Sequence, residues 1–501
     1  MSFAIEMKDI TKYFPGVVAN DHVNLQVKNQ EIHCLLGENG TGKTTLMNIL
    51  FGLYQPNEGT IIINGQEING HHPKDALKMG LGMIHQHFML VDRLSVLENV
   101  ILGFEVGDIH LDLKNNYLKV KALSDIYNFG LDLNSKVADL SVGMKQRVEI
   151  LKTLYRGANT IIMDEPTAVL TPQEVDELLV ILGGLKAQGK SIIFITHKLH
   201  ETMAIADRIT VLRKGKNVIT LDRKDTNADD LAMYMVGRHV NLKQDYGTHE
   251  PGPCIMSYQG IRLHKKSKSP FNLDIRAGEI VGIAGVEGHG QMELEELTMG
   301  LMKCKEGRIL LKGQDITHDS TLARKREKMG YIPSDRHKRA MFENFSISEN
   351  MLLGYQWEPQ FSNHGFLKLQ ALKDHTRQNI DRFSVKVNDP DQRIGDLSGG
   401  NQQKVILARE ISQDPDFILA AQPSRGLDIG AVEFVHSRLI NLRNADKAVL
   451  LISADLDEVL HLSDRVAVLF EGEIVALFNK GELKKEAVGL YMAGHQPGVQ
   501  S

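Results

Sequence analysis

Four blocks of this 501-residue sequence occur twice, in the same order along the chain. The paired blocks are residues 25–32 and 273–280, 140–146 and 397–403, 160–167 and 417–424, and 194–197 and 451–454. Such self-similarity is the mark of a duplicated structural unit, and the chain is too long for a single core. The sequence therefore predicts two domains of the same fold.

The two copies are joined by a short polar segment. It contains Gly247, Pro251, Gly252 and Pro253, a composition typical of a linker. We therefore predict a first domain over residues 1–240, a linker over 241–254 and a second domain over 255–495.

Both halves show the same coarse pattern of apolar residues. Val23, Leu25 and Val27 alternate with polar residues, which indicates an antiparallel strand with one solvated face. Apolar runs at 192–195 and 448–452 are typical of buried parallel strands, and residues 94–139 form a more helical, charged stretch. We predict an α/β fold in which each domain is a mixed sheet flanked by helices, with a helical subdomain and an antiparallel β subdomain.

A glycine-rich segment of the first half fits the pattern G-x-x-x-x-G-K-[ST]. It consists of Gly37, Glu38, Asn39, Gly40, Thr41, Gly42, Lys43, Thr44 and Thr45. In such a P-loop the backbone N–H groups surround the phosphates of a nucleotide, and the positive end of the next helix points at them. Lys43 would neutralise the β- and γ-phosphate oxygens, and the Thr44 hydroxyl would hold Mg²⁺.

Further polar groups follow apolar runs at the ends of predicted strands. Asp164 would help to hold Mg²⁺, and Glu165 would activate the attacking water as a general base. His197 would contact the γ-phosphate, and Gln86 could reach both the metal and the water. The predicted catalytic residues are Glu165, His197 and Gln86, and the predicted metal ligands are Thr44, Gln86 and Asp164.

The second half has lost most of these groups. Gln291 replaces Lys43 and Met292 replaces Thr44, while Gln422 stands in the place of Glu165. The segment Leu-Ser-x-Gly shows the opposite difference, because it is complete as Leu-Ser-Gly-Gly at 397–400 and altered at 140–143.

The P-loop, Gln86, Leu-Ser-x-Gly, Asp-Glu and His, in this order, resemble the nucleotide-binding domain of ABC transporters. The resemblance covers nearly the whole chain, twice. In that family two domains pack head to tail, and each ATP lies between the P-loop of one domain and the Leu-Ser-Gly-Gly signature of the other. The resemblance implies that the first-half groups share one site with Ser398, Gly399, Gly400 and Asp428.

A second composite site would collect the changed residues. It would join Gln291, Met292, Ser334, Ala421, Gln422 and Ala454 to the signature at 140–143, with Thr171 in the place of Asp428. We therefore expect one hydrolytic site per chain, and the sequence leaves open whether the second site binds nucleotide. Phe14, or its neighbour Tyr13, could stack on adenine or could pack in the core.

Duplicated halves with a degenerate second P-loop resemble the ATPases of bacterial sugar and nucleoside importers. The segments 85–91, 335–338 and 420–428 are most similar to the nucleoside branch, although Ser334 stands where the family usually has Glu. The resemblance implies uptake of nucleosides, with a ribose or galactose type of sugar as the alternative. It implies ATP and Mg²⁺ as cofactors, with two transmembrane permease subunits and an extracytoplasmic solute-binding protein as partners.

The composition restricts where such a chain can act. No apolar run approaches the roughly 18–20 residues of a membrane span, so we expect a peripheral protein on the cytoplasmic face of the cell membrane. Residues 88–91 are a candidate docking surface for the permease, or else part of the core. A net charge of −5 argues against a nucleic-acid partner. The rival is a soluble ABC ATPase acting on ribosomes, for which we would expect two complete sites and a long basic linker.

Overall fold

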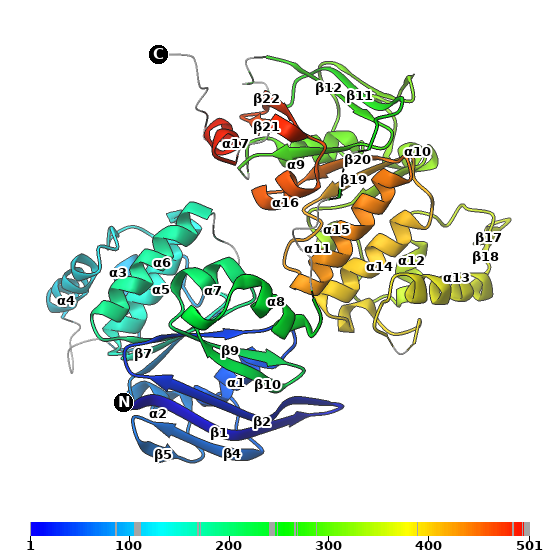
Figure 1. Cartoon of the computed structure of the whole chain (residues 1–501). Helices are drawn as coiled ribbons and strands as arrows, with labels where there is room; N and C mark the ends of the chain where they lie inside the picture. Colours follow the sequence, from blue (N-terminus) through cyan, green and yellow to red (C-terminus); the bar gives the residue numbers. More distant parts are fainter. Residues whose placement is uncertain are drawn as a thin grey trace. The chain divides into compact units, whose positions relative to one another are not determined.

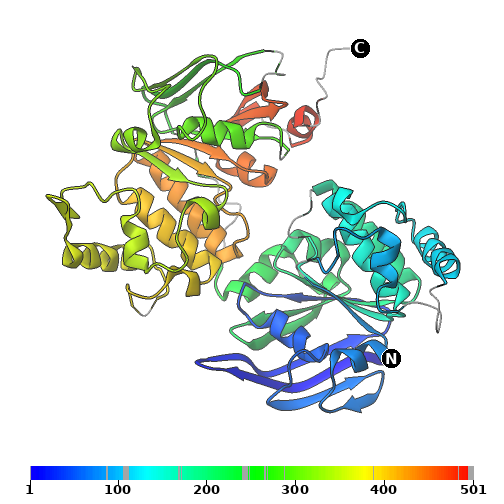
Figure 2. The same ribbon diagram turned by 180° about the vertical axis from the view of Figure 1, so that it is seen from behind.

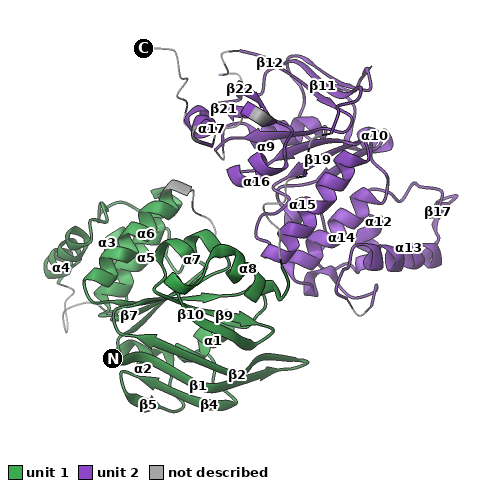
Figure 3. Cartoon of the chain, in the orientation of Figure 1, with its two compact units in different colours: residues 1–240 green, residues 241–501 purple. Residues whose placement is uncertain are grey.

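The chain forms two compact units, Met1–Val240 and Asn241–Ser501 (Figure 3). The computed structural model describes residues 2–85, 88–104, 112–167, 170, 172–239, 246–247, 249–264, 267, 269–286, 288–387, 389–482, 485–492 and 494. No helix within these residues combines the length and the apolar character needed to cross a bilayer.

The described residues of unit 1 form two sheets (Figure 1). The first has the order β2-β1-β4-β5 and is antiparallel; its strands are β1 (Phe3–Phe14), β2 (Val17–Lys28), β4 (Glu58–Ile63) and β5 (Gln66–Ile68). The second has the order β10-β9-β3-β8-β7-β6; its strands are β3 (Ile32–Leu36), β6 (Leu81–Ile84), β7 (Thr160–Asp164), β8 (Ser191–Thr196), β9 (Arg208–Arg213) and β10 (Lys216–Asp222). Along β2, Val23, Leu25 and Val27 are buried and alternate with exposed residues, as predicted.

The helices of unit 1 fall into two groups. The helical subdomain contains α3 (Val96–Ile101), α4 (Leu113–Ile126) and α5 (Val142–Tyr155), which contact one another. The others are α1 (Lys43–Leu50), α2 (Pro73–Lys78), α6 (Pro172–Ala187), α7 (Leu199–Ile205) and α8 (Ala228–Val236), with 3₁₀ turns at Val137–Asp139 and Arg223–Asp225. Helix α1 lies beside β2 and is seen from behind in Figure 2.

Unit 2 repeats these two sheets strand for strand. Its antiparallel sheet has the order β12-β11-β14-β15, with β11 (Cys254–Ile261), β12 (Phe271–Arg276), β14 (Arg308–Leu311) and β15 (Gln314–Asp315). Its larger sheet has the order β16-β19-β20-β13-β21-β22, with β13 (Ile280–Ala284), β16 (Met329–Ile332), β19 (Phe417–Ala421), β20 (Ala448–Ile452), β21 (Arg465–Phe470) and β22 (Glu473–Asn479). The predicted α/β fold with a duplicated sheet architecture is confirmed.

The helices of unit 2 correspond in order to those of unit 1, except that α11 has no counterpart among the described residues of unit 1. They are α9 (Gln291–Thr298), α10 (Thr321–Arg326), α11 (Arg336–Arg339), α12 (Ile347–Leu352), α13 (Leu369–Arg382), α14 (Gly399–Ile411), α15 (Ile429–Asn444), α16 (Leu456–Leu462) and α17 (Lys485–Met492). Short 3₁₀ turns occupy Ile394–Asp396 and Lys480–Glu482, and a small hairpin joins β17 (Ser362–Asn363) to β18 (Phe366–Leu367).

The parallel strands of unit 1 explain how its polar groups come together. Strands β3, β7 and β8 are parallel neighbours, with Asp164 paired to Ile195 and Leu36 paired to Thr196. All three strands are buried and apolar for most of their length. Because the carboxyl ends of parallel strands share one edge, the P-loop and the residues after β7 and β8 emerge side by side.

Candidate nucleotide site

The P-loop connects β3 to α1 and is closed by its own lysine. Gly40 and Gly42 have φ angles of +77° and +93°, which favour glycine. A Cβ on Gly42 would also lie 2.2 Å from the carbonyl oxygen of Ala19. The ammonium of Lys43 donates to the carbonyl oxygens of Gly37 (2.7 Å) and Glu38 (2.8 Å). These two hydrogen bonds fix the conformation of the loop and keep the positive charge of Lys43 against it.

Asp164 provides the best evidence for a metal ligand. Its side chain is only 3% exposed, and its Oδ1 has no hydrogen-bond partner among the residues that the structure describes. Burial raises the pKa of this carboxyl, although a hydrogen bond from Thr44 acts in the opposite direction. A buried carboxylate oxygen with no donor, beside a threonine hydroxyl, fits the oxygen ligands that Mg²⁺ prefers.

Glu165 and His197 form a pair beside this carboxylate. Glu165 Oε1 lies 3.0 Å from Nδ1 of His197, and the backbone N–H of Glu165 donates to the carbonyl oxygen of Ile195 (3.1 Å). Burial would raise the pKa of Glu165, but the bond to His197 and the nearby charge of Lys43 outweigh it and lower the pKa. Glu165 is therefore ionised at neutral pH, as a general base must be.

The structure provides less evidence for two of the predicted residues, Gln86 and Phe14. Gln86 lies outside the described residues, between the end of β6 and Phe88. Phe14 ends β1, is partly buried, and meets Tyr54 edge to face with ring centroids 5.6 Å apart. The ammonium of Lys12 lies 5.5 Å from the same ring. Stacking of Phe14 on adenine stays a prediction.

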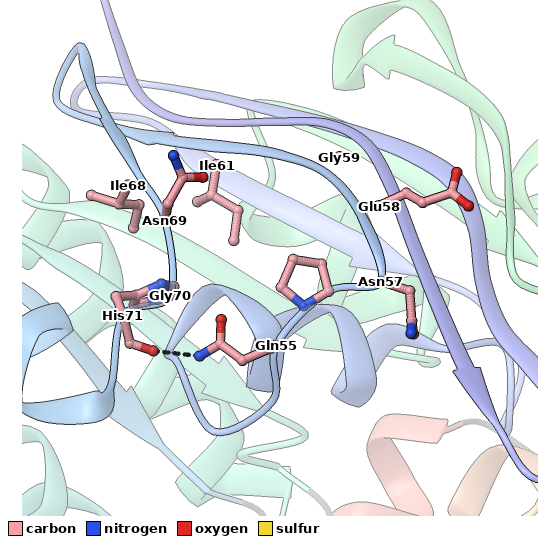
Figure 4. A pocket seen from close by; sticks show the side chains of 10 residues that line it. Gln55, Asn57, Glu58, Gly59, Ile61, Ile68, Asn69, Gly70 and His71 are labelled. Atoms are coloured by element: carbon pink, nitrogen blue, oxygen red, sulfur yellow. Dashed lines mark hydrogen bonds between the residues drawn. The ribbon is translucent and has the colours of Figure 1, made fainter.

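A cavity of about 200 Å³ lies in unit 1 (Figure 4). Its lining comes from residues 55–59, 61 and 68–71, and the amide of Gln55 donates to the carbonyl oxygen of His71 (2.7 Å). Asn57, which also lines the cavity, accepts a bond through Oδ1 from the backbone N–H of Tyr13 (2.9 Å). The cavity contains none of the predicted site residues, but its wall supports the strand end that carries Phe14.

Unit 2 keeps the loop shapes without the charges. Gln291 Nε2 donates to the carbonyl oxygen of Val286 (2.9 Å), much as Lys43 does in unit 1. Gln422 has the same φ of +47° as Glu165, and its Oε1 accepts a bond from the backbone of Ala454 (3.3 Å). Neutral amides therefore replace the ammonium and the carboxylate in an otherwise similar backbone.

The complete signature begins a helix of unit 2. Ser398 is the N-cap residue of α14, and Gly399 and Gly400 form its first turn. Asp428 caps α15, with Oδ1 accepting from the backbone N–H of Ala431 (2.8 Å). A Cβ on Gly400 would lie 3.8 Å from Oδ2 of Asp428, so these predicted residues are neighbours. That they share one site with groups of unit 1 stays a prediction.

One residue near the site was not foreseen from the sequence. Glu201 on α7 is fully buried, and its Oε2 accepts from the hydroxyls of Thr167 (2.8 Å) and Thr196 (3.0 Å). Thr167 follows Glu165 by two residues and Thr196 immediately precedes His197. A single carboxylate thus joins the two loops that carry the Glu–His pair, and no motif in the sequence announces it.

Comparison with known proteins places this geometry in context. The family model described as ABC transporter matches residues 20–168 and 269–425. The chain is 49% identical to the guanosine import ATP-binding protein NupO of Bacillus subtilis, over 99% of the chain and 98% of that protein. It is 45% identical to the nucleoside import ATP-binding protein NupA of Lactococcus lactis (98% of each). It is 41% identical to the glucose import ATP-binding protein TsgD13 of Haloferax volcanii (98% and 96%).

A solved structure also resembles most of the chain. It is the archaeal ribosome recycling factor aABCE1 in complex with the stalk protein aP1, with a TM-score of 0.61 over 93% of this chain and 88% of that one. At 20% identity, this likeness shows the fold alone.

Proposed function

Since the chain belongs to the ABC transporter family, we propose that it is the ATP-hydrolysing subunit of an importer for nucleosides. The observation that carries the proposal is the cluster of Lys43, Asp164, Glu165 and His197 at one sheet edge of unit 1. Two relatives whose names state nucleoside or guanosine import match nearly the whole chain.

The contacts of unit 1 support a defined division of labour during hydrolysis. The P-loop amides and Lys43 hold the phosphates, while Asp164 and Thr44 are the groups that would hold Mg²⁺. Bound there, Mg²⁺ would offset charge on the β- and γ-phosphate oxygens. Glu165 takes the proton from the attacking water, a contribution of about 10²–10⁴ in rate. His197 orients Glu165 through their shared contact.

The loss of groups in unit 2 argues for a single hydrolytic site. Gln422 cannot act as a base at neutral pH, and Gln291 has no charge to place against a phosphate. We propose that Ser398, Gly399, Gly400 and Asp428 complete the hydrolytic site. Ser398 is the N-cap of α14, Gly399 and Gly400 begin that helix, and Asp428 is the N-cap of α15. A helix start is a favourable place for a phosphate.

Nucleosides are favoured over sugars by the comparison of relatives. The two nucleoside relatives are 49% and 45% identical to this chain, and the glucose relative is 41% identical. Sugar import therefore remains the second candidate. The likeness to a ribosome recycling factor supports no ribosomal role because it reaches only 20% identity.

Exposed apolar side chains support docking to permease subunits. Met89 and Val91 are 60% and 45% exposed, so this part of the 88–91 segment is surface. In unit 2, Phe342 and Phe345 are 59% and 43% exposed and their ring centroids are 5.1 Å apart. We propose that these side chains belong to surfaces that contact the permeases. We place the chain on the cytoplasmic face of the membrane, with two permeases and an external solute-binding protein.

Uptake in the native cell tests the proposal. Labelled guanosine, ribose and glucose are offered to cells that carry the wild-type chain, Lys43→Ala or Gln291→Ala. We expect guanosine uptake to fall to background in Lys43→Ala and to be retained in Gln291→Ala, because only Lys43 supplies a cation. Loss of sugar uptake alone in Lys43→Ala would show that the chain serves a sugar importer. Unchanged uptake of all three compounds in that variant would refute an import role for these substrates.

A further inference from the structure

A cation stands beside the complete signature in unit 2. Arg336, at the start of α11, donates through Nη1 to the carbonyl oxygen of Arg425 (3.1 Å). Its Nη2 lies 2.9 Å from the position that a Cβ on Gly399 would take, and 3.9 Å from the same position on Gly426. The guanidinium is therefore packed against the first turn of α14, and a side chain at position 399 would have to displace it.

The guanidinium retains unused hydrogen-bonding capacity. Its Nε is buried and has no hydrogen-bond partner among the described residues, and Nη1 makes the bond to Arg425. The nearby carboxylate of Asp428 is engaged by the backbone N–H of Ala431. Arginine stays protonated and presents donors in a flat fork that suits phosphate oxygens.

The altered signature of unit 1 has the opposite charge. The carboxylate of Glu174 accepts from the backbone N–H of Gly143 (3.0 Å) and from the hydroxyl of Ser141 (3.4 Å). The start of α5 is thus already occupied by an anion of the same chain. In the aligned positions of unit 2, alanine (Ala431) replaces this glutamate.

The cation beside the signature of unit 2 has no equivalent at the aligned position of unit 1. Phe88 of unit 1 aligns with Arg336, and Val142 aligns with the glycine that makes room for the guanidinium. The unit 2 signature therefore has a guanidinium packed against Gly399, with the carboxylate of Asp428 near Gly400. In the unit 1 signature, the carboxylate of Glu174 already accepts from a backbone N–H. A phosphate group would be attracted to the first and repelled by the second.

From this contrast we infer that Arg336 is a further residue of the hydrolytic site, where it recognises the γ-phosphate of ATP next to Gly399. The inference rests on the proposed function, in which the complete signature faces that phosphate. Arg336 then discriminates ATP from ADP, because ADP lacks the group that the guanidinium binds.

Nucleotide binding by the full chain tests this role. All variants carry Glu165→Gln to prevent hydrolysis, and dissociation constants for ATP and ADP are measured with Mg²⁺ by equilibrium dialysis. The variants are Arg336→Gln, Arg336→Lys and Arg438→Gln. Arg438 is the matched control because it also donates to a backbone carbonyl, that of Arg382, and also has a buried Nε without a partner among the described residues.

We expect Arg336→Gln to weaken ATP binding about tenfold, the scale of one charge-assisted hydrogen bond, and to change ADP binding less than about twofold. Arg336→Lys should restore part of the ATP affinity, and Arg438→Gln should resemble the parent. Equal losses for ATP and ADP, or equal effects of the two glutamine variants, would show a structural role and overturn the inference. A parent that binds neither nucleotide would instead overturn the proposed function, and this inference with it.

Discussion

The substitution Glu165→Gln is the most direct test of the proposed chemistry, because the chain itself shows that the fold accepts it. Gln422 occupies the equivalent position in unit 2 with the same φ of +47°. Its backbone N–H donates to Ile452 (2.7 Å), as that of Glu165 donates to Ile195 (3.1 Å). The variant therefore changes a charge and a basic oxygen while the backbone keeps a conformation already used with glutamine.

The size of the effect follows from the state of the carboxyl. The contact with His197 (3.0 Å) and the charge of Lys43 lower the pKa of Glu165 against the effect of burial, so the wild-type group is fully ionised at pH 7. The amide has no basic oxygen, so the whole general-base contribution is lost. We expect kcat to fall about 10²–10⁴-fold, which corresponds to about 3–5 kcal/mol of transition-state stabilisation.

Steady-state phosphate release by the purified full chain, or by the chain with its membrane partners, measures this loss. Affinity for ATP should be retained, because the P-loop and Lys43 are unchanged. The reciprocal variant Gln422→Glu should not add activity, since unit 2 also lacks the lysine and the histidine. A Glu165→Gln protein with kcat within about threefold of wild type would refute the role of Glu165 as the base.

Three further outcomes are expected. Glu201→Gln should lower kcat about tenfold with little change in KM, because the carboxylate that joins Thr167 and Thr196 keeps the Glu–His pair in place. A Thr196→Ser variant keeps the hydroxyl and should remain active. Asp164→Asn should raise the Mg²⁺ concentration needed for half-maximal hydrolysis, measured by metal titration after chelation. Glu31 has a lowered pKa, since bonds from His33 and Lys28 and the charge of Arg208 outweigh burial. Its stabilisation is complete above the ordinary pKa of 4.5 and is lost as the pH falls through the lower folded-state value, so in Glu31→Gln the urea midpoint should depend less on pH in that acidic range.

The sequence was most informative where function depends on local pattern. The P-loop spacing, the apolar run before Asp164 and the alternation along β2 are properties of neighbouring residues, and each predicted its element correctly. The parallel sheet then brings Asp164 and His197 together, because their strands end at the same edge. A reader of the sequence could therefore predict the fold and the position of unit 1 groups relative to one another.

Partners that meet only through tertiary packing could not be predicted in this way. Glu201 contacts Thr167 across 34 positions of sequence, and Arg336 approaches Gly399 across two different elements. Which rotamer a glutamate or arginine adopts is set by the surrounding packing, and no spacing rule encodes it. The position of Gln86 lies outside the described residues, so its predicted role is supported by the sequence pattern alone.

The pattern of change in unit 2 follows from electrostatics. The charge of Lys43 lowers the pKa of both Asp164 and Glu165, so removal of Lys43 alone would leave two buried carboxyls without its compensating charge. In unit 2 the equivalent positions are Gln291, Ala421 and Gln422, so the ammonium and both carboxylates have been lost together. Gln291 and Gln422 each satisfy a backbone group, a carbonyl and an N–H respectively. The neutral set preserves the loops that support α9 and the end of β19, and this explains how the unit can lose its chemistry while it keeps its fold.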